Sequence, residues 1–411
     1  MAAQPIAVTR AYSPVRFYAL LPYSPQMQAR PPVIVIAPDS FKGSTAASAT
    51  ASAIAEGLRR VWPGAELRLC PMADGGEGTL DAVLSRGGQR LTAGVTGAAG
   101  KTVEAGYGIV GEGKIAIIEA AQIVGLTDPD GTAIDVEQRS SRGVGELMAK
   151  LLDGGLLEFM VGLGGTSTND GGAGMLAALG LRLLDAKGRA VEATPEGLAK
   201  LAAVDAARLD PRLRRTTITI MSDVDNVLAG PGGATAIFGP QKGVRIERVG
   251  ELDARLARFA ALVENALGKT ARDRPGAGAA GGLGFALQLL GGEMRSGAEV
   301  VADLVGLDAA LRGADWVITG EGRTDAQTLL GKTPFVVARH GAAMGVPATL
   351  ISGGIDRTAL PELSRHFAGC FSLTDGPMTL EDCIANAARL LADRGEQAGR
   401  LYAAARGAGA V

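Results

Sequence analysis

Apolar residues near the start of the chain fall into short runs that alternate with polar, glycine-containing stretches. Segment 33–40 opens with four apolar residues, which is typical of a buried strand, and ends in a polar turn. Segment 44–60 has the apolar spacing of a helix, with Ser44 as the expected N-cap. A second strand is expected at 67–70, and it leads into another glycine-rich loop and helix. These positions predict two consecutive β-α units.

The pattern changes in the middle of the chain. From 87 to 110 many Thr, Val and Gly residues lie in short extended pieces, which indicates antiparallel strands. Apolar runs at 158–163 and 216–221 predict further strands, and the first of them leads through a glycine-rich loop towards a helix. The middle therefore predicts a mixed α/β unit.

Three more strands are expected after a helical stretch that begins beyond Gly282. They are the apolar runs 316–319, 348–352 and 369–373, and each ends in a polar or glycine-containing loop. Together with the two strands near the start they make five parallel strands, the number in a flavodoxin-like sheet.

We therefore predict an α/β fold of two domains. A flavodoxin-like parallel-sheet domain is discontinuous and carries a large inserted mixed α/β domain. The first residues are rich in proline and lack the cleavage pattern of a signal peptide, so we expect a disordered extension. The predicted boundaries are 1–31 for the extension, 32–72 plus 291–411 for the flavodoxin-like domain and 73–290 for the insertion.

Composition restricts the class of protein. Of 411 residues, 47% are hydrophobic and 20% charged, so the chain can bury large cores and does not resemble a disordered protein. Its formal net charge of -2 gives no basic field for nucleic acid or an anionic membrane. Three cysteines lack the spacing of a metal site or a disulfide scaffold. We expect a globular, cytoplasmic protein whose partner is a small molecule; its oligomeric state stays open.

Acidic, basic and glycine residues are dense where the predicted strands end. In open α/β sheets, ligands bind beyond the carboxyl ends of the strands, so we expect these loops to converge on a site. The loops are DSFKGS (39–44), ADGGEGT (73–79), GGTSTNDGG (164–172), SDVDN (222–226) and GEGRTD (320–325).

The loop at 164–172 combines close-packing glycines with hydroxyl groups and precedes a helix. Such a loop can cradle a phosphate, because free amides at a helix N-terminus bind anions. The alternative is a tight turn in which Asn169 or Asp170 caps the helix. The expected cradle residues are Gly164, Gly165, Thr166, Ser167 and Asn169.

Two other motifs carry charge. Asp223 and Asp225 are two positions apart and share a face in an extended segment, as magnesium ligands do, although a polar turn fits the same pattern. Lys242, in FGPQKG, can neutralise phosphate charge or simply face solvent.

The stretch 315–334 is the richest in chemistry. Arg323 can bind a carboxylate through two parallel hydrogen bonds, and Glu321 and Lys332 lie close to it in sequence. Asp325 is either a reactive carboxylate or a helix N-cap.

Several other site classes are excluded. The segment 276–281 satisfies GxGxxG but follows Arg-Pro rather than a strand, so it does not predict a dinucleotide site. The segment 326–333 nearly matches a P-loop, but Ala326 replaces its first glycine. Neither of the two histidines, His340 and His366, lies in these loops. An acidic, glycine-rich and lysine-containing site remains, which suits phosphoryl transfer.

The motifs taken together resemble those of the type 1 bacterial glycerate kinase family. The resemblance runs from about Val33 to the C-terminal helix. Each motif alone is weak evidence for the family, whereas the whole series in this order is specific for it. The series is APDSFKGS, PMADGGEGT, GGTSTNDGG, SDVDN with FGPQKG, GAGAAGGLG, ITGEGRTDAQTLLGK and ISGG.

The resemblance implies phosphorylation of D-glycerate with ATP and Mg²⁺, usually giving 2-phosphoglycerate. Within such a site we expect Lys42 or Lys242 to stabilise the transferred charge, Arg323 to hold the glycerate carboxylate, and Asp170, in preference to Asp325, to act as the base. Alternatives are 3-phosphoglycerate as product, another small hydroxy acid as acceptor, and a non-catalytic ligand-binding regulator on the same fold. Further binding residues implied by the motifs are Asp39, Ser40, Asp74, Glu77 and Ser352.

Overall fold

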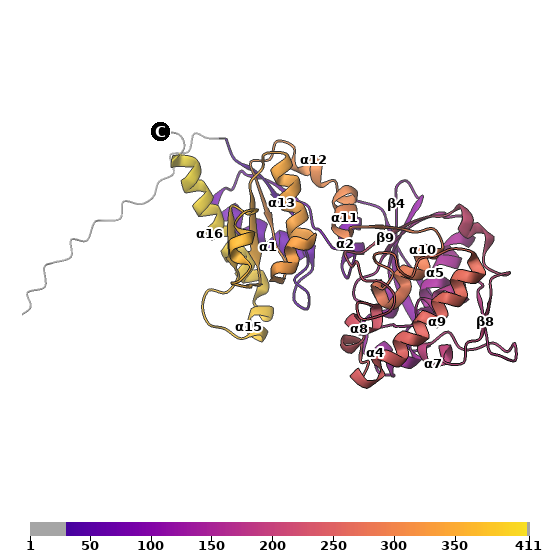
Figure 1. The fold of residues 1–411 in the computed structure, drawn as a ribbon. Helices are drawn as coiled ribbons and strands as arrows, with labels where there is room; N and C mark the ends of the chain where they lie inside the picture. The colour runs from indigo at the N-terminus through magenta and orange to yellow at the C-terminus, as the bar shows by residue number, and fades with distance from the viewer. Residues whose placement is uncertain (1–29, 409–411) are drawn as a thin grey trace, which may run out of the picture.

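A computed structural model describes residues 30–408 as two lobes joined by a narrower middle (Figure 1). Each lobe is built on its own sheet. The predicted N-terminal extension lies outside the described residues except for its last two positions.

The first lobe contains a five-stranded, fully parallel sheet of order β15-β13-β11-β1-β2. Counted along this lobe alone, the order is 2-1-3-4-5, which is the flavodoxin-like order. The predicted fold class is therefore confirmed. The strands are β1 (Val33–Ile36), β2 (Glu66–Leu69), β11 (Trp316–Thr319), β13 (Ala348–Ser352) and β15 (Gly369–Ser372).

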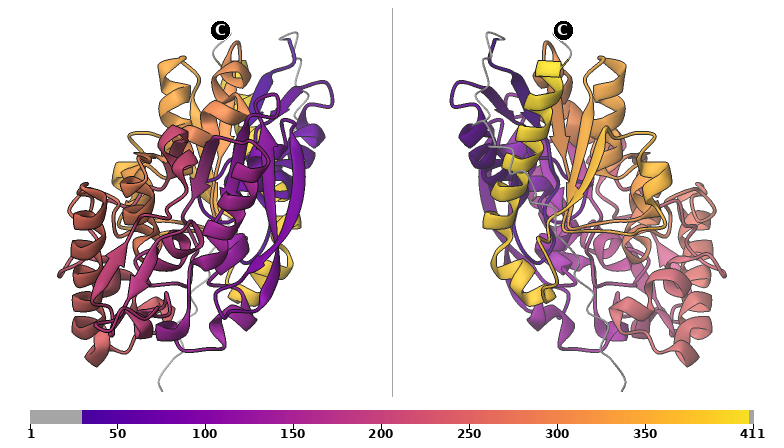
Figure 2. Two further views of the ribbon diagram at one scale, coloured as in Figure 1. Left: turned by 90° about the vertical axis from the view of Figure 1, so that its right-hand side faces the viewer. Right: turned by 90° about the vertical axis from the view of Figure 1, so that its left-hand side faces the viewer.

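Helices cover both faces of this sheet, as the alternation of side chains along a strand requires. Ile34 and Ile36 of β1 pack with one helical layer, whereas Val35 packs with the other. Figure 2 shows α16 along the outside of this lobe. One layer is α1 (Ala47–Val61) with α16 (Ala387–Ala408), and the other is α11 (Gly297–Val305), α12 (Leu307–Leu311) and α13 (Thr333–Ala343).

The predicted N-cap of α1 is wrong. The helix begins at Ala47, and Ala46 precedes it without a side-chain cap. Ser44 instead belongs to a tight turn in which the Phe41 and Thr45 backbones bond to each other. Gly43 has a φ of +75°, which explains the glycine in this turn.

The second lobe contains a six-stranded mixed sheet of order β10-β9-β6-β5-β4-β3. The predicted antiparallel strands at 87–110 are confirmed as β3 and β4, and β10 extends this sheet past residue 290. Sequence patterns missed β5 and β10. The strands are β3 (Gln89–Thr96), β4 (Thr102–Val110), β5 (Ile115–Glu119), β6 (Glu158–Gly162), β9 (Thr217–Met221) and β10 (Glu293–Arg295).

A large apolar core fills the second lobe, and Phe159, Phe259 and Phe285 are its largest side chains. Phe259 and Phe285 meet edge to face, with ring centroids 6.2 Å apart. The main helices around this core are α5 (Arg142–Asp153), α6 (Ala173–Ala178), α9 (Val249–Leu267) and α10 (Leu283–Leu289).

A shared apolar cluster connects the lobes. It joins Val35 of the first sheet to Ile117 and Met221 of the second, through α11 and the short helix α2 (Thr79–Leu84). Within residues 30–408 no helix is long and apolar enough to span a membrane.

Candidate active site

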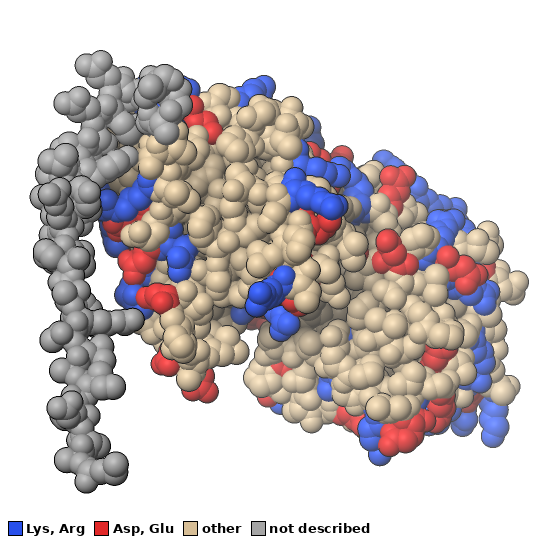
Figure 3. Space-filling model, turned by 60° about the vertical axis from the view of Figure 1, so that its left-hand side comes forward, with Lys and Arg blue, Asp and Glu red and all other residues tan. Residues whose placement is uncertain are grey.

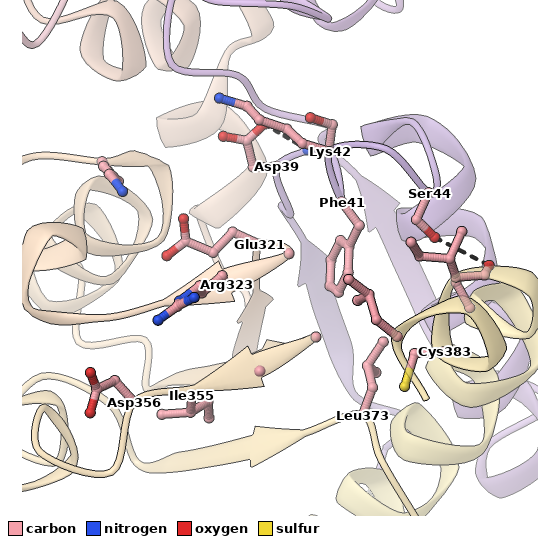
Figure 4. Close-up of a pocket in the computed structure, with 18 of the residues that line it drawn as sticks. Asp39, Phe41, Lys42, Ser44, Glu321, Arg323, Ile355, Asp356, Leu373 and Cys383 are labelled. Carbon is pink, nitrogen blue, oxygen red and sulfur yellow. Dashed lines mark hydrogen bonds between the residues drawn. The ribbon is translucent and has the colours of Figure 1, made fainter. Parts of the chain in front are cut away.

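A pocket of about 680 Å³ opens at the carboxyl ends of the parallel strands in the first lobe (Figure 4). The segments after β1, β11, β13 and β15 all contribute to it, as expected for an open α/β sheet. Seven of the residues predicted from sequence line it: Asp39, Ser40, Lys42, Asp74, Glu321, Arg323 and Lys332.

Asp39 is a buried carboxylate at the wall of this pocket. Its Oδ1 accepts a hydrogen bond of 2.6 Å from the Ser40 amide, and its Oδ2 accepts one of 2.9 Å from the Thr333 hydroxyl. Burial, followed by repulsion from Asp74, raises the pKa of Asp39 to about 7. The carboxylate can therefore change charge near neutral pH.

Lys42 is the cation nearest to these carboxylates. Its Nζ lies 3.3 Å from Oδ2 of Asp74, and this carboxylate is the main reason that the pKa of Lys42 is raised. The lysine side chain is 59% exposed, so it can turn towards a ligand. The other oxygen of Asp74 accepts a hydrogen bond from the Gly76 amide.

The loop after β11 provides a second carboxylate and two cations. Glu321 accepts hydrogen bonds from the hydroxyls of Thr324 and Thr328, while burial raises its pKa. Arg323 is exposed and faces the pocket, where Figure 4 places it between Glu321 and Asp356. Lys332 lies at the entry of α13.

Two predicted residues near this loop do not line the pocket. Asp325 accepts a hydrogen bond from the Gln327 amide and forms a capping box with Thr328, which confirms the alternative of a helix N-cap. Ser352 is fully buried and shares a 2.7 Å hydrogen bond with Thr324.

Glycine contacts join the pocket to the second lobe. A Cβ added at Gly164 would lie 2.5 Å from the Cα of Gly76, and one added at Gly297 would lie 2.1 Å from the Asp74 carbonyl oxygen. Only glycine permits such close backbone approach. The loops at 73–79 and 164–172 and the start of α11 therefore meet directly, as the sequence predicted for the first two.

Most of the loop at 164–172 is buried rather than open. Asp170 is fully buried, and its carboxylate accepts four hydrogen bonds, two from Ser141 and one each from the amides of Gly172 and Gly174. These last two amides lie at the start of α6, which confirms the capping alternative. Burial raises the pKa of Asp170, although each of these donors opposes the rise.

Some polar atoms of this loop have no protein partner. The hydroxyl of Thr168 and the side-chain oxygen of Asn169 are buried without a hydrogen bond among the described residues. The Asn169 amide nitrogen donates to the Thr235 hydroxyl. A hydroxyl that can donate or accept and an amide oxygen that can only accept are therefore left for a ligand to satisfy at this loop.

Lys242 is buried, so the alternative that it faces solvent is wrong. Its Nζ donates a 2.7 Å hydrogen bond to the Thr168 carbonyl oxygen. Burial lowers the pKa of Lys242 to about 7, opposed by Asp170 and assisted by Arg139.

Arg139 is a residue that sequence analysis missed. Its guanidinium is buried and donates five hydrogen bonds to the carbonyl oxygens of Thr132, Ile134, Ser167 and Lys242. It forms no ion pair within the part of the chain that the structure describes. Through these hydrogen bonds Arg139 links the backbone at Ser167 to the backbone at Lys242. No sequence motif marks it.

Asp223 and Asp225 lie where β9 ends at the junction of the lobes. Asp223 accepts a hydrogen bond of 3.2 Å from the Gly297 amide. Although its side chain reaches solvent, partial desolvation between the lobes raises its pKa to about 6, with repulsion from Asp74 and Asp225 adding to the effect. Asp225 has no hydrogen bond or ion pair within residues 30–408.

No group of three or more His, Cys, Asp or Glu residues among those described could hold a metal ion by itself. Asp74 and Asp225 lie near enough to Asp223 to raise its pKa by repulsion, so the junction of the lobes is locally acidic. Glu77, another predicted residue, is exposed on the same loop as Asp74. Figure 3 shows the groove between the lobes, with basic side chains gathered beside it.

Glu119 is a further residue that sequence analysis missed. It is buried at the end of β5 and accepts hydrogen bonds from the amides of Gly78 and Leu80. It therefore fixes the start of α2 and, with it, the loop that carries Asp74 and Gly76. Its distance in sequence from that loop hides this role.

Known proteins are similar to this chain over almost all of its length. A model of the "Glycerate kinase family" matches residues 34–403. A glycerate kinase of Bacillus subtilis (strain 168) is 42% identical over 365 residues, which cover 87% of this chain and 94% of that protein. A glycerate 2-kinase of Escherichia coli (strain K12) is 43% identical over 325 residues, covering 78% of this chain and 85% of that protein.

A solved structure agrees with these relatives. A crystal structure described as a glycerate kinase 2 from Salmonella typhimurium LT2 superposes with a TM-score of 0.79 at 40% sequence identity. The match covers 92% of this chain and 99% of that one.

Proposed function

The chain belongs to the glycerate kinase family and is a glycerate kinase, and from this premise we propose that it transfers the γ-phosphoryl group of ATP to the 2-hydroxyl of D-glycerate. The observation that carries the proposal is the pocket in which Asp39, Lys42 and Asp74 meet Glu321 and Arg323 at the strand ends. Similarity to a glycerate 2-kinase supports the 2-position.

In the reaction, the 2-hydroxyl oxygen forms a bond to the γ-phosphorus while the bond from that phosphorus to the β,γ-bridging oxygen breaks, releasing ADP. The hydroxyl proton goes to a base. Lys42 offsets negative charge on the moving phosphoryl group, because it already faces Asp74 and is free to turn. Arg323 holds the glycerate carboxylate through its planar fork of donors.

We assign the base to Asp39. Asp170, favoured from sequence, has both oxygens engaged by four donors, and Asp325 is occupied as a cap. Asp39 lines the pocket, and its pKa of about 7 suits proton transfer at neutral pH.

The loop at 164–170 and Lys242 form the phosphate-binding side of the second lobe. The Thr168 hydroxyl has no partner among the described residues and can donate to a phosphate oxygen, and the contact of Gly164 with Gly76 puts this loop beside the Asp74 segment. Arg139 and Lys242 add positive charge beneath it.

Magnesium would be held by Asp223 and Asp225, directly or through water, together with Asp74. When bound, the ion neutralises phosphate charge and orients the triphosphate. The carboxylates themselves supply the oxygen ligands, and the hydrogen bond from the Gly297 amide fixes the orientation of Asp223. Closure of the lobes over this region would exclude water.

The sequence-based division into a discontinuous domain (32–72 plus 291–411) and an insertion (73–290) stays a prediction, and β10, which joins the second sheet, moves the proposed end of the insertion past Arg295. The proposal also keeps the cytoplasm as the compartment, which suits the three unpaired cysteines.

Phosphorus NMR of the product from D-glycerate, ATP and Mg²⁺ tests this function, because it reports transfer and position together. A 2-phosphoglycerate signal is expected. A 3-phosphoglycerate signal would change the regiochemistry, and transfer only to another hydroxy acid of a panel would change the acceptor. Absence of transfer to every acceptor would refute the ATP-dependent proposal and favour a ligand-binding regulator.

A further inference from the structure

The pocket has two ends of different chemistry. Its polar end carries the carboxylates and cations described above. Its other end is apolar and is lined by Phe41, Leu373, Leu380, Cys383 and Ile384. Figure 4 shows Leu373 and Cys383 on the side away from Glu321 and Arg323, with Phe41 between the two groups.

Two residues of the apolar end leave large side chains in water. Leu380 is 75% exposed and Ile384 is 40% exposed, and both belong to the short helix α15 (Leu380–Ala385). Covering apolar surface gains about 25 cal/mol per Å². Because both side chains line a concave pocket, a ligand that enters it can cover them.

The position of α15 is set by the chain around it. Thr379 caps its N-terminus by accepting a hydrogen bond from the Asp382 amide. The Ser44 hydroxyl donates to the Ile384 carbonyl oxygen and links the helix to the turn that carries Phe41 and Lys42. The apolar wall and the phosphate-facing lysine therefore belong to one connected unit.

The size of the pocket exceeds the needs of glycerate. A volume of about 680 Å³ is typical of a site for a drug-sized ligand, and glycerate has no apolar group to place at the far end. A nucleoside triphosphate has both a flat, largely apolar base and a strongly anionic tail. These two parts match the two ends.

We propose that the nucleobase of ATP binds at the apolar end, against Phe41 and α15, and that the triphosphate extends towards Lys42 and Lys332. This inference rests on the proposed use of ATP and adds where the nucleotide lies. It assigns to Leu380, Cys383 and Ile384 a role in nucleotide binding. Arg323 stays available to bind the carboxylate of glycerate.

Cys383 provides a test that does not depend on turnover. The full chain has three cysteines, of which Cys383 lines the pocket, Cys370 is equally half-buried but does not line it, and Cys70 is buried. Labelling by N-ethylmaleimide is followed at each site by mass spectrometry. A non-hydrolysable ATP analogue with Mg²⁺ should slow labelling of Cys383 at least fivefold and leave Cys370 unchanged. Equal Cys383 labelling at saturating analogue would overturn the proposal, as would protection by D-glycerate alone.

A matched pair of variants provides the kinetic test. Leu380→Asp should raise the KM for ATP about tenfold and leave the KM for D-glycerate unchanged. Leu401→Asp is the control, since Leu401 is 61% exposed on α16 and does not line the pocket. An unchanged KM for ATP in Leu380→Asp would refute the proposed nucleobase site and leave the proposed function standing. Failure of the wild-type chain to transfer phosphate from ATP to D-glycerate refutes the proposed function instead.

Discussion

The ammonium group of Lys242 donates a 2.7 Å hydrogen bond to the carbonyl oxygen of Thr168, in a part of the second lobe that solvent does not reach. Lys242 has no carboxylate within ion-pair distance in residues 30–408, and the Arg139 cation lies nearby. A buried cation with so little compensation is costly unless it loses its proton or meets an anion. This relationship makes the loop at 164–170 sensitive to charge.

Stability should depend on pH through Lys242. Its pKa is about 7 in the folded chain and 10.5 as the ordinary value, so between these pH values the unfolded chain binds a proton that the folded chain lacks. The free energy of unfolding therefore rises with pH over this window, by up to about 1.4 kcal/mol per pH unit. Urea unfolding measured from pH 7 to 9 should show that the unfolding free energy rises less with pH in Lys242→Met than in the wild type. Lys101→Met, at a 70% exposed site, is the control; identical pH slopes for all three proteins would contradict the prediction.

Activity should rise with pH through the ionisation of Asp39. A base must be deprotonated, and its pKa is about 7, so kcat/KM should fall below neutral pH. Asp39→Asn should lower kcat at least about 100-fold. The same variant should be no less stable than the wild type at pH 8, because it removes a buried charge. A pH profile from 5.5 to 8.5 and unfolding at pH 8 check both parts. Near-normal turnover would exclude Asp39 as the base.

Asp170→Asn should act on stability first. The amide nitrogen would face donors that now meet a carboxylate oxygen, so we expect a loss of about 3 kcal/mol in unfolding free energy. Asp325→Asn, at a partly exposed cap, should lose no more than about 1 kcal/mol. Denaturant unfolding and turnover of both variants are measured together. If the Asp170→Asn protein is stable but inactive, Asp170 rather than Asp39 is the catalytic base.

Gly164→Ala should separate the two loops that meet at the lobe junction. The added methyl would lie 2.5 Å from the Gly76 Cα, so one backbone has to move. A shift of about 1 Å at a site can cost about 100-fold in rate, and we expect a loss of that order in kcat/KM with the fold retained. Gly232→Ala, where nothing lies within 4 Å of the added atom, should behave like the wild type. Circular dichroism confirms folding, and equal rates for both variants would show that the contact is unimportant.

Arg139→Lys should loosen the loop without changing net charge. An ammonium has fewer donors than the five hydrogen bonds of Arg139 require, so some of its carbonyl partners lose their bonds. We expect about 2 kcal/mol lower stability and faster amide exchange across 164–170. Arg142→Lys, at an exposed pair with Glu146, is the control. Unchanged exchange in Arg139→Lys would refute this linking role.

The first sheet could be predicted because its strands are short apolar runs that each end at a polar loop. All five were located, and their parallel arrangement followed from the β-α order. The second sheet was harder. β10 has only three residues, which is too short to give a pattern. β5 follows a glycine-containing turn, and the Thr- and Gly-rich segment before that turn hides where one strand ends and the next begins.

The site could be predicted in part. Loop positions at strand ends located Asp39, Lys42, Asp74 and Glu321, because topology alone brings such loops together. Side-chain environment was not visible in the sequence: it could not distinguish the pocket-lining Asp39 from the capped Asp170. Arg139 and Glu119 act through backbone groups distant in sequence, and no pattern reveals such partners.

The discontinuous sheet also has a consequence for synthesis. The amide of Val33 bonds to the carboxylate of Asp315, 282 positions later, so β1 and β2 leave the ribosome long before β11 exists. The intervening segment contains most of its own core and can fold while the nascent chain is still growing. Until β11 emerges, β1 presents an unpaired apolar edge. We therefore expect the first lobe to assemble last, because its sheet needs β11, β13 and β15, and a chain truncated before them would have a folded insertion but no pocket.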